Sequence, residues 1–159
     1  MVVPGRRGAG LFTVTRDGKR VAWVALTKPW YACPSVGVVR TSPISALNGG
    51  DALIEGTPIV SSLFDCDIQP GKSPIEGLSF SPDGSQIVVA KNPEPESYGF
   101  DLEIYKLDGT LVRRLTDNGG GASPVINWNP DWSPDNRIVF ASNRSGTFEI
   151  YTINPDGTD

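Results

Sequence analysis

The chain has 159 residues, a formal net charge of −4 and 38% hydrophobic residues, which is the profile of a globular domain with a core of its own. It contains no histidine, which excludes a Ser-His-Asp or Cys-His triad within this sequence and removes the commonest transition-metal ligand. Without a cluster of basic residues we expect no nucleic-acid binding, and no apolar run approaches the roughly 18 residues of a membrane span.

The N-terminal part of the chain predicts short strands. Its first 18 residues lack an apolar stretch after their arginines, so we expect no signal peptide in this sequence. The stretch "VTRDGKRVAWV" (14–24) indicates a turn followed by an apolar strand, and "VGVVRT" (36–41) indicates a further strand. The 18 glycines and 14 prolines are spread along the chain, which is typical of many short strands joined by turns. We therefore expect a first, divergent unit at about residues 10–60.

The middle of the chain holds the clearest unit, at about residues 75–116. The stretch "FSPDGSQIVVA" (80–90) places Ser, Pro, Asp and Gly at the four positions of a type I turn. The strand that follows is apolar on both faces, which indicates that it is covered on both sides. The stretch "LEIYKLDGTLVRRLT" (102–116) predicts two more strands around an Asp-Gly hairpin turn.

The C-terminal part repeats this unit at about residues 125–159 but has no counterpart of its fourth strand. The stretch "WSPDNRIVFAS" (132–142) matches the first half of the unit, and "FEIYTINPDGT" (148–158) matches its third strand and the turn after it. Asn136 stands where the unit has Gly, and Asn also adopts the left-handed backbone conformation. The turn is therefore expected to survive this replacement.

The repeated unit resembles the TolB-type, WD-like β-propeller repeat, in which each unit forms one four-stranded blade. The resemblance is specific over residues 75–159 and weaker before them. It implies an all-β fold, a β-propeller segment of about three four-stranded antiparallel blades, of which the last lacks its outer strand. We expect structural roles at the repeat positions Phe80, Pro82, Asp83, Gly84, Tyr105, Trp132, Pro134, Asp135, Tyr151, Asp156 and Gly157.

A segment of about three blades leaves two alternatives, because propellers typically have 4–8 blades. In the first, a longer chain supplies the remaining blades. In the second, two copies associate into a closed ring as a homodimer. An open arc would expose apolar faces and unpaired strand edges, which promotes aggregation.

Alternation of strand direction predicts two different sides of the blades. The signature turns, which join the first and second strands of each unit at 15–18, 81–84 and 133–136, fall on one side, the turn face, together with the turns at 107–110 and 154–157. The long connections at about 27–37, 56–76, 91–101 and 116–130 fall on the other side, the loop face. Variable loops on a rigid scaffold are a common way to build a binding surface, and Trp and Tyr are frequent anchors there. The alternative is that these aromatics fill gaps between blades, Trp128 above all. The candidate ligand or partner contacts are Trp30, Tyr31, Tyr98, Trp128 and Asn129.

The two cysteines, Cys33 and Cys66, both fall on loop-face connections that border the first unit. They are candidates for a disulfide in an oxidising compartment and for free thiols otherwise. The C-terminal "NPDGTD" lacks the full spacing of a calcium loop. We therefore expect neither a metal site nor a cofactor.

These features favour a non-catalytic binding module that presents its loop face to a protein, a peptide or a glycan. The alternative is the substrate-gating propeller of a prolyl-oligopeptidase-like or tricorn-like serine peptidase whose catalytic domain lies outside this sequence. A propeller that processes oligosaccharides would need converging carboxylates or a metal centre, and the sequence offers neither. The resemblance implies a periplasmic or extracellular setting for the parent protein.

Overall fold

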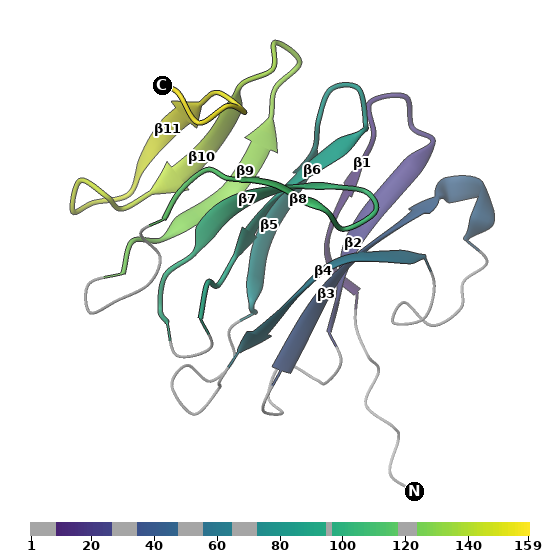
Figure 1. Ribbon diagram of the computed structural model, residues 1–159, viewed down its shortest axis with the longest axis horizontal. Helices are drawn as coiled ribbons and strands as arrows, with labels where there is room; N and C mark the ends of the chain where they lie inside the picture. Colours follow the sequence, from purple (N-terminus) through teal and green to yellow (C-terminus); the bar gives the residue numbers. More distant parts are fainter. Residues whose placement is uncertain (1–8, 27–34, 48–55, 65–72, 95–96, 118–123) are drawn as a thin grey trace, which may run out of the picture.

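A computed structural model describes residues 9–26, 35–47, 56–64, 73–94, 97–117 and 124–159 and places them in three antiparallel sheets, here called blades 1 to 3 (Figure 1). Blade 1 consists of β1 (Ala9–Val14), β2 (Arg20–Leu26), β3 (Ser35–Pro43) and β4 (Thr57–Phe64), with a short 3₁₀ helix at Ile44–Ala46. Blade 2 consists of β5 (Ile75–Phe80), β6 (Gln86–Lys91), β7 (Asp101–Lys106) and β8 (Leu111–Arg114). Blade 3 consists of β9 (Asn127–Trp132), β10 (Ile138–Ser142) and β11 (Glu149–Ile153).

Each blade is a simple meander, because every strand pairs with the strand next to it in the sequence. The four-stranded blades 1 and 2 and the three-stranded blade 3 confirm the predicted all-β propeller segment whose last blade lacks its outer strand. Within the described residues, none of the helical segments has the length and apolarity to cross a membrane.

Three of the predicted loop-face connections are shorter than the sequence indicated, and one of them, at about 27–37, loses its last residues to β3, which begins at Ser35. Residues 57–64, assigned to a long connection at about 56–76, form β4, and Val60 of this strand pairs with Val39 of β3. Residues 127–130, assigned to the connection at 116–130, open β9 despite the proline at position 130. That proline sits where the β9–β10 register shifts, which is the kind of irregularity at which a strand tolerates proline.

The turn between β5 and β6 shows why its residues repeat. The Gly84 N–H donates to the Ser81 carbonyl at 2.8 Å, and Gly84 has a φ of +71°, which favours glycine. The Ser81 hydroxyl donates to Asp83 Oδ1 at 2.6 Å, and the Ser85 N–H donates to the same oxygen at 3.0 Å. Serine, aspartate and glycine each hold the turn, whereas Pro82 fills the second position without donating a bond.

The same pattern recurs in the first and third blades. In the turn between β1 and β2, Gly18 has a φ of +69° and the Thr15 hydroxyl donates to Asp17 Oδ1 at 2.7 Å. In the turn between β9 and β10, Asn136 has a φ of +66° and its side-chain oxygen also accepts the Trp132 indole N–H at 2.9 Å. Asparagine therefore keeps the turn and adds a partner for a buried tryptophan.

Two hydrophobic cores lie between the three blades, one between each pair of neighbours. The strand "IVVA" of β6 serves both, because Ile87 and Val89 face blade 1 while Val88 and Ala90 face blade 3. This explains why that strand is apolar on both faces. The aromatic residues that precede the signature turns are both buried, Phe80 in the first core and Trp132 in the second.

Blades 2 and 3 interlock through β5 and β9. The Ser79 hydroxyl donates to Asp131 Oδ1 at 3.0 Å and accepts the backbone N–H of Trp132 at 3.0 Å. A Cβ at Gly77 would lie 2.6 Å from Pro130 Cδ, so a larger residue would force the two strands apart. Small residues on β5 thus permit the close approach of the neighbouring blade.

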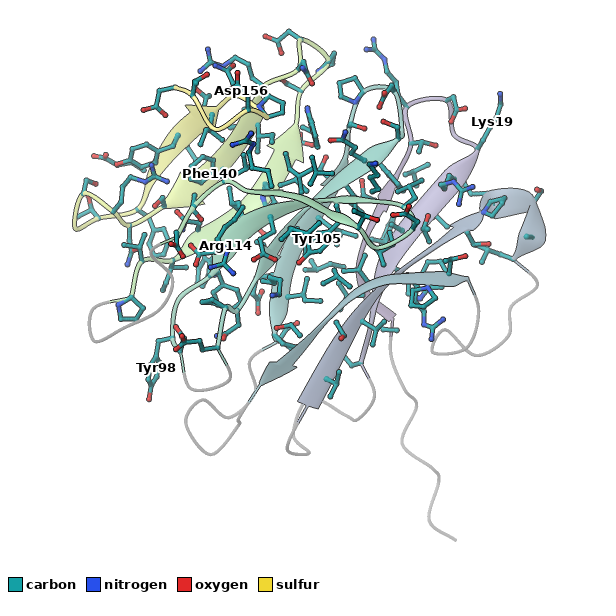
Figure 2. The ribbon with its side chains drawn as sticks, in the orientation of Figure 1. Lys19, Tyr98, Tyr105, Arg114, Phe140 and Asp156 are labelled. Carbon is teal, nitrogen blue, oxygen red and sulfur yellow. The ribbon has the colours of Figure 1, made fainter. Side chains whose placement is uncertain are left out.

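A buried ion cluster lies on the side of blade 2 that faces blade 1. The side chain of Glu103 on β7 is 2% exposed and lies 3.4 Å from Lys91 Nζ and 3.1 Å from Arg114 Nε. The Tyr105 hydroxyl donates a hydrogen bond to the same carboxylate. Figure 2 shows Tyr105 and Arg114 on neighbouring strands of this blade. Burial of a carboxylate is tolerated here because cations and a hydroxyl satisfy its oxygens.

The environment of Tyr105 leads us to expect that the chain loses stability at alkaline pH. Burial, reinforced by the hydrogen bond to the Glu103 carboxylate, raises the pKa of Tyr105 well above its ordinary value of 10.0. The folded state therefore keeps a proton that the unfolded state releases, and this contribution is complete below about pH 10 and is lost as the pH rises further. We expect the free energy of unfolding, measured with urea between about pH 8 and 11, to fall more steeply in the native chain than in Tyr105→Phe. Equal slopes for the native chain and Tyr105→Phe would contradict this account.

The two ends of the segment present apolar side chains. Phe12 on β1 is 73% exposed and Ile150 on β11 is 72% exposed. These strands belong to the first and last blades in Figure 1. In a propeller such faces pack against a neighbouring blade.

Candidate functional site

The structure describes three of the five predicted loop-face contacts. Tyr98 is 48% exposed and lies at the edge of the molecule opposite the signature turns, as Figure 2 shows. Trp30 and Tyr31 lie outside the described residues, as do Cys33 and Cys66, so their predicted binding and disulfide roles stay predictions.

Trp128 belongs to an aromatic cluster with Phe100 and Phe148. Its ring stacks on Phe148 with the ring centroids 5.1 Å apart and meets Phe100 edge-on at 6.4 Å. The side chain is half-buried. These contacts favour the structural alternative for Trp128 over a role as a free anchor.

Asn129 is exposed, and its backbone conformation has a φ of +49°. It stands where β9 is irregular, next to the position at which Gly77 allows blade 2 to approach. Its left-handed backbone is therefore part of the contact between blades 2 and 3. Neither Asn129 nor Tyr98 lines any of the three hollows described below.

The loop-face ends of blades 2 and 3 are joined by a buried polar network that the sequence analysis did not identify. The Thr116 hydroxyl donates to Asp101 Oδ1 at 2.7 Å and accepts from Asn127 Nδ2 at 3.3 Å. Arg144 Nη2 donates to Asn127 Oδ1 at 3.2 Å, and its guanidinium group lies over the rings of Phe140 and Tyr151. The hydrogen bond between Asn127 and Thr116 therefore connects blades 2 and 3, whereas Arg144 orients Asn127 from within blade 3. This network is a structural feature.

Three adjoining hollows of the described surface lie on the turn face. The basic hollow, of about 280 Å³, lies between the turns of blades 1 and 2 and includes Arg16, Lys19 and Arg20 among its lining residues. The inner hollow, of about 320 Å³, lies beside it and is lined by Arg16, Phe80, Pro82, Trp132 and Pro134 with others. Figure 2 shows Lys19 at this edge of the molecule.

The outer hollow completes the row on the turn face. It has a volume of about 440 Å³ and lies between the turns of blades 2 and 3, with Pro82, Trp132, Pro134 and Pro155 among its lining residues. Pro82 borders all three hollows. Proline and tryptophan give the row apolar walls, and the charged side chains are concentrated at the blade 1 end.

The carboxylates of the basic hollow are held by their own turns. Hydrogen bonds from the Thr15 hydroxyl and the Lys19 N–H lower the pKa of Asp17. Hydrogen bonds from the Ser81 hydroxyl and from Ser85 lower the pKa of Asp83. Both groups are therefore ionised at neutral pH, with much of their hydrogen-bonding capacity already in use.

Arg16 is the residue that sequence reasoning missed. It occupies the second position of its turn, where the other two signature turns have Pro82 and Pro134. The signal was this departure from the repeat, which we interpreted as divergence of the first unit. A position that the turn does not use for its own hydrogen bonds is free to carry a functional side chain.

The side chains of the turn face offer charged and apolar groups to a ligand. Among the described residues, no group of three or more His, Cys, Asp or Glu is arranged to hold a metal ion. The three hollows offer guanidinium and ammonium donors, turn backbone, and apolar walls. Such a surface can recognise a chain that carries both an anionic group and apolar side chains.

The fold is similar to that of solved β-propeller structures. A protein assigned as TolB from Agrobacterium tumefaciens aligns with a TM-score of 0.63 and 23% identity over 93% of this chain and 43% of its own. TolB from Acinetobacter baumannii aligns with a TM-score of 0.61 and 17% identity over 96% of this chain and 31% of its own. The β-propeller domain of the Trilobed protease from Pyrococcus furiosus aligns with a TM-score of 0.58 and 10% identity over 96% of this chain and 40% of its own.

These alignments identify the fold as a partial TolB-like β-propeller. The chain spans less than half of the length of each of these three proteins. No protein-family model and no curated protein matches the sequence.

Proposed function

We propose that this propeller segment is a non-catalytic binding module that holds a peptide segment of a partner protein against its turn face. The observation that carries this proposal is the row of three adjoining hollows, all of which are bordered by Pro82. Turns from three blades contribute to the row. A ligand in it would thus contact several blades at once.

The rigidity of the turns supports this function. Each signature turn is closed by a backbone hydrogen bond, such as Gly18 N–H to the Thr15 carbonyl at 2.8 Å and Asn136 N–H to the Ser133 carbonyl at 3.0 Å. A surface that is already ordered loses little conformational entropy when it binds. The net charge of −4 favours a protein or peptide over a nucleic acid, and a glycan remains an alternative ligand.

One comparison favours a second candidate function, the substrate-gating propeller of a peptidase. A similar solved structure is the β-propeller domain of a protease. This chain contains no histidine, so a Ser-His-Asp reaction would have to be catalysed by residues outside it. We also propose a periplasmic or extracellular setting for the parent protein, and further blades from a longer chain or a second copy to cover Phe12 and Ile150.

The binding function is tested with peptides selected from a random display library against the 159-residue chain. In Pro134→Tyr a large side chain would fill the junction of the inner and outer hollows, and Arg16 shows that this turn position accepts a residue other than proline. We expect Pro134→Tyr to abolish binding and Tyr98→Ser to leave it unchanged. The reverse result would place binding on the loop face, and a library that yields no binder would overturn the proposal.

A further inference from the structure

The basic hollow has cationic donors that the protein itself does not use. In the part of the chain that the structure describes, the guanidinium groups of Arg16 and Arg20 have no hydrogen-bond or ion-pair partner, whereas Lys19 pairs with Asp17 at 3.6 Å. Three cationic and two carboxylate side chains line this hollow. It is therefore locally positive on a chain whose net charge is −4.

The two carboxylates do not occupy these donors, because they are directed into their own turns. Asp17 accepts from the Thr15 hydroxyl at 2.7 Å and from the Lys19 N–H at 3.0 Å. Asp83 accepts from the Ser81 hydroxyl at 2.6 Å and from Ser85 through both its N–H and its hydroxyl. An anion that enters the hollow thus meets Arg16 and Arg20 with their N–H groups available.

Arg16 links this charge to an apolar surface. It lines both the basic hollow and the inner hollow, where Phe80, Pro82, Trp132 and Pro134 supply the wall. A single extended chain that crosses Arg16 can place an anionic group on one side and an apolar side chain on the other. The two hollows are thus adjacent subsites of one groove.

We propose that Arg16 is the specificity-determining residue of the turn face and that it binds the carboxylate of an acidic residue next to an apolar residue in a peptide. This inference rests on the proposed binding function and names the class of its ligand. The planar fork of a guanidinium group matches a carboxylate, with which it forms two parallel hydrogen bonds. The three cationic and two carboxylate side chains of the lining leave one net positive charge, which a singly charged carboxylate balances and a phosphate dianion exceeds.

The probe is the blocked peptide Ac-Gly-Ser-Phe-Glu-Ser-Gly-NH₂, titrated into the isotopically labelled chain by nuclear magnetic resonance. In matched peptides glutamine replaces glutamate, serine replaces phenylalanine, or phosphoserine replaces glutamate. The test variant is Arg16→Pro, which gives the first turn the residue found in the other two and so preserves its geometry. Arg113→Gln, at an exposed arginine outside the three hollows, is the matched control for loss of a positive charge.

We expect the Phe-Glu peptide to lose about tenfold or more in affinity on Arg16→Pro, since a hydrogen-bonded charge pair disappears, and to keep its affinity on Arg113→Gln. The glutamine peptide should bind the native chain weakly and be insensitive to Arg16→Pro. Equal affinities for the glutamate and glutamine peptides, tighter binding of the phosphoserine peptide, or an unchanged affinity on Arg16→Pro would each overturn the inference. If library-selected peptides still fail to bind Pro134→Tyr in that case, the binding function stands and only the assignment of its ligand class is wrong.

Discussion

Replacing Glu103 with alanine is expected to destabilise the chain by about 3–5 kcal/mol, which is the usual cost of removing one member of a buried ion pair. The side chain of Lys91 is 16% exposed, so its ammonium group would keep little hydration once its partner is lost. Tyr105 would also lose the acceptor of its hydroxyl group. Arg114 contributes less to this cost, because it is 44% exposed and keeps its ion pair with Asp117. Urea unfolding at neutral pH measures the effect.

Glu149 offers a matched control, since it occupies the same position in the third repeat. Its carboxylate accepts from the Ser145 hydroxyl at 3.1 Å and from the Tyr151 hydroxyl at 3.1 Å, but its side chain is exposed. Glu149→Ala should change the free energy of unfolding by no more than about 0.5 kcal/mol. Equal costs for the two substitutions would show that the Glu103 cluster is not the buried network described above.

Trp132→Ala is expected to cost about 3–5 kcal/mol, because it removes a large side chain from the core between blades 2 and 3. Trp132 is 7% exposed, and its indole N–H donates to Asn136, so the substitution leaves both a cavity and an unpartnered side-chain oxygen. The unfolding free energy and the hydrogen exchange of β10 amides measure the effect. We expect exchange to accelerate in blade 3 more than in blade 1.

Two substitutions separate the volume of Trp132 from its hydrogen bond. Trp132→Phe keeps an aromatic ring but no indole N–H, so its cost should be smaller than that of the alanine variant. Trp128→Ala removes a tryptophan that is half-buried in its cluster with Phe100 and Phe148, and its cost should also be smaller. A Trp132→Ala variant as stable as Trp128→Ala would contradict a core role for Trp132.

The fold could be predicted from the sequence because the turns are local. Ser81, Asp83 and Gly84 hold their turn through contacts within a few residues, and the same spacing recurs around Asp135 and Asp156. The apolar pattern of "IVVA" indicated a strand covered on both sides, and β6 is such a strand. Turns of this kind can be predicted from a single sequence, because the contacts that form them are made within a few residues.

The candidate site could not be predicted in the same way, because it depends on how turns from different blades come together. Arg16 and Phe80 are far apart in the sequence, and they line one hollow only because blades 1 and 2 pack side by side. The sequence also favours exposed aromatics such as Trp128 as anchors, but its stack with Phe148 forms only when the strands of blade 3 are in place. The strand at 57–64 was missed for a similar reason, since its pairing partner on β3 lies across an intervening connection.

The second position of each signature turn has a consequence for how this surface could change over evolution. Three positions hold the turn, and the remaining one carries Arg16, Pro82 or Pro134 without altering the backbone bond that closes it. Each blade thus displays one interchangeable residue at an equivalent position on the turn face. Substitutions at this position could change the binding specificity of one blade at a time without disturbing the fold.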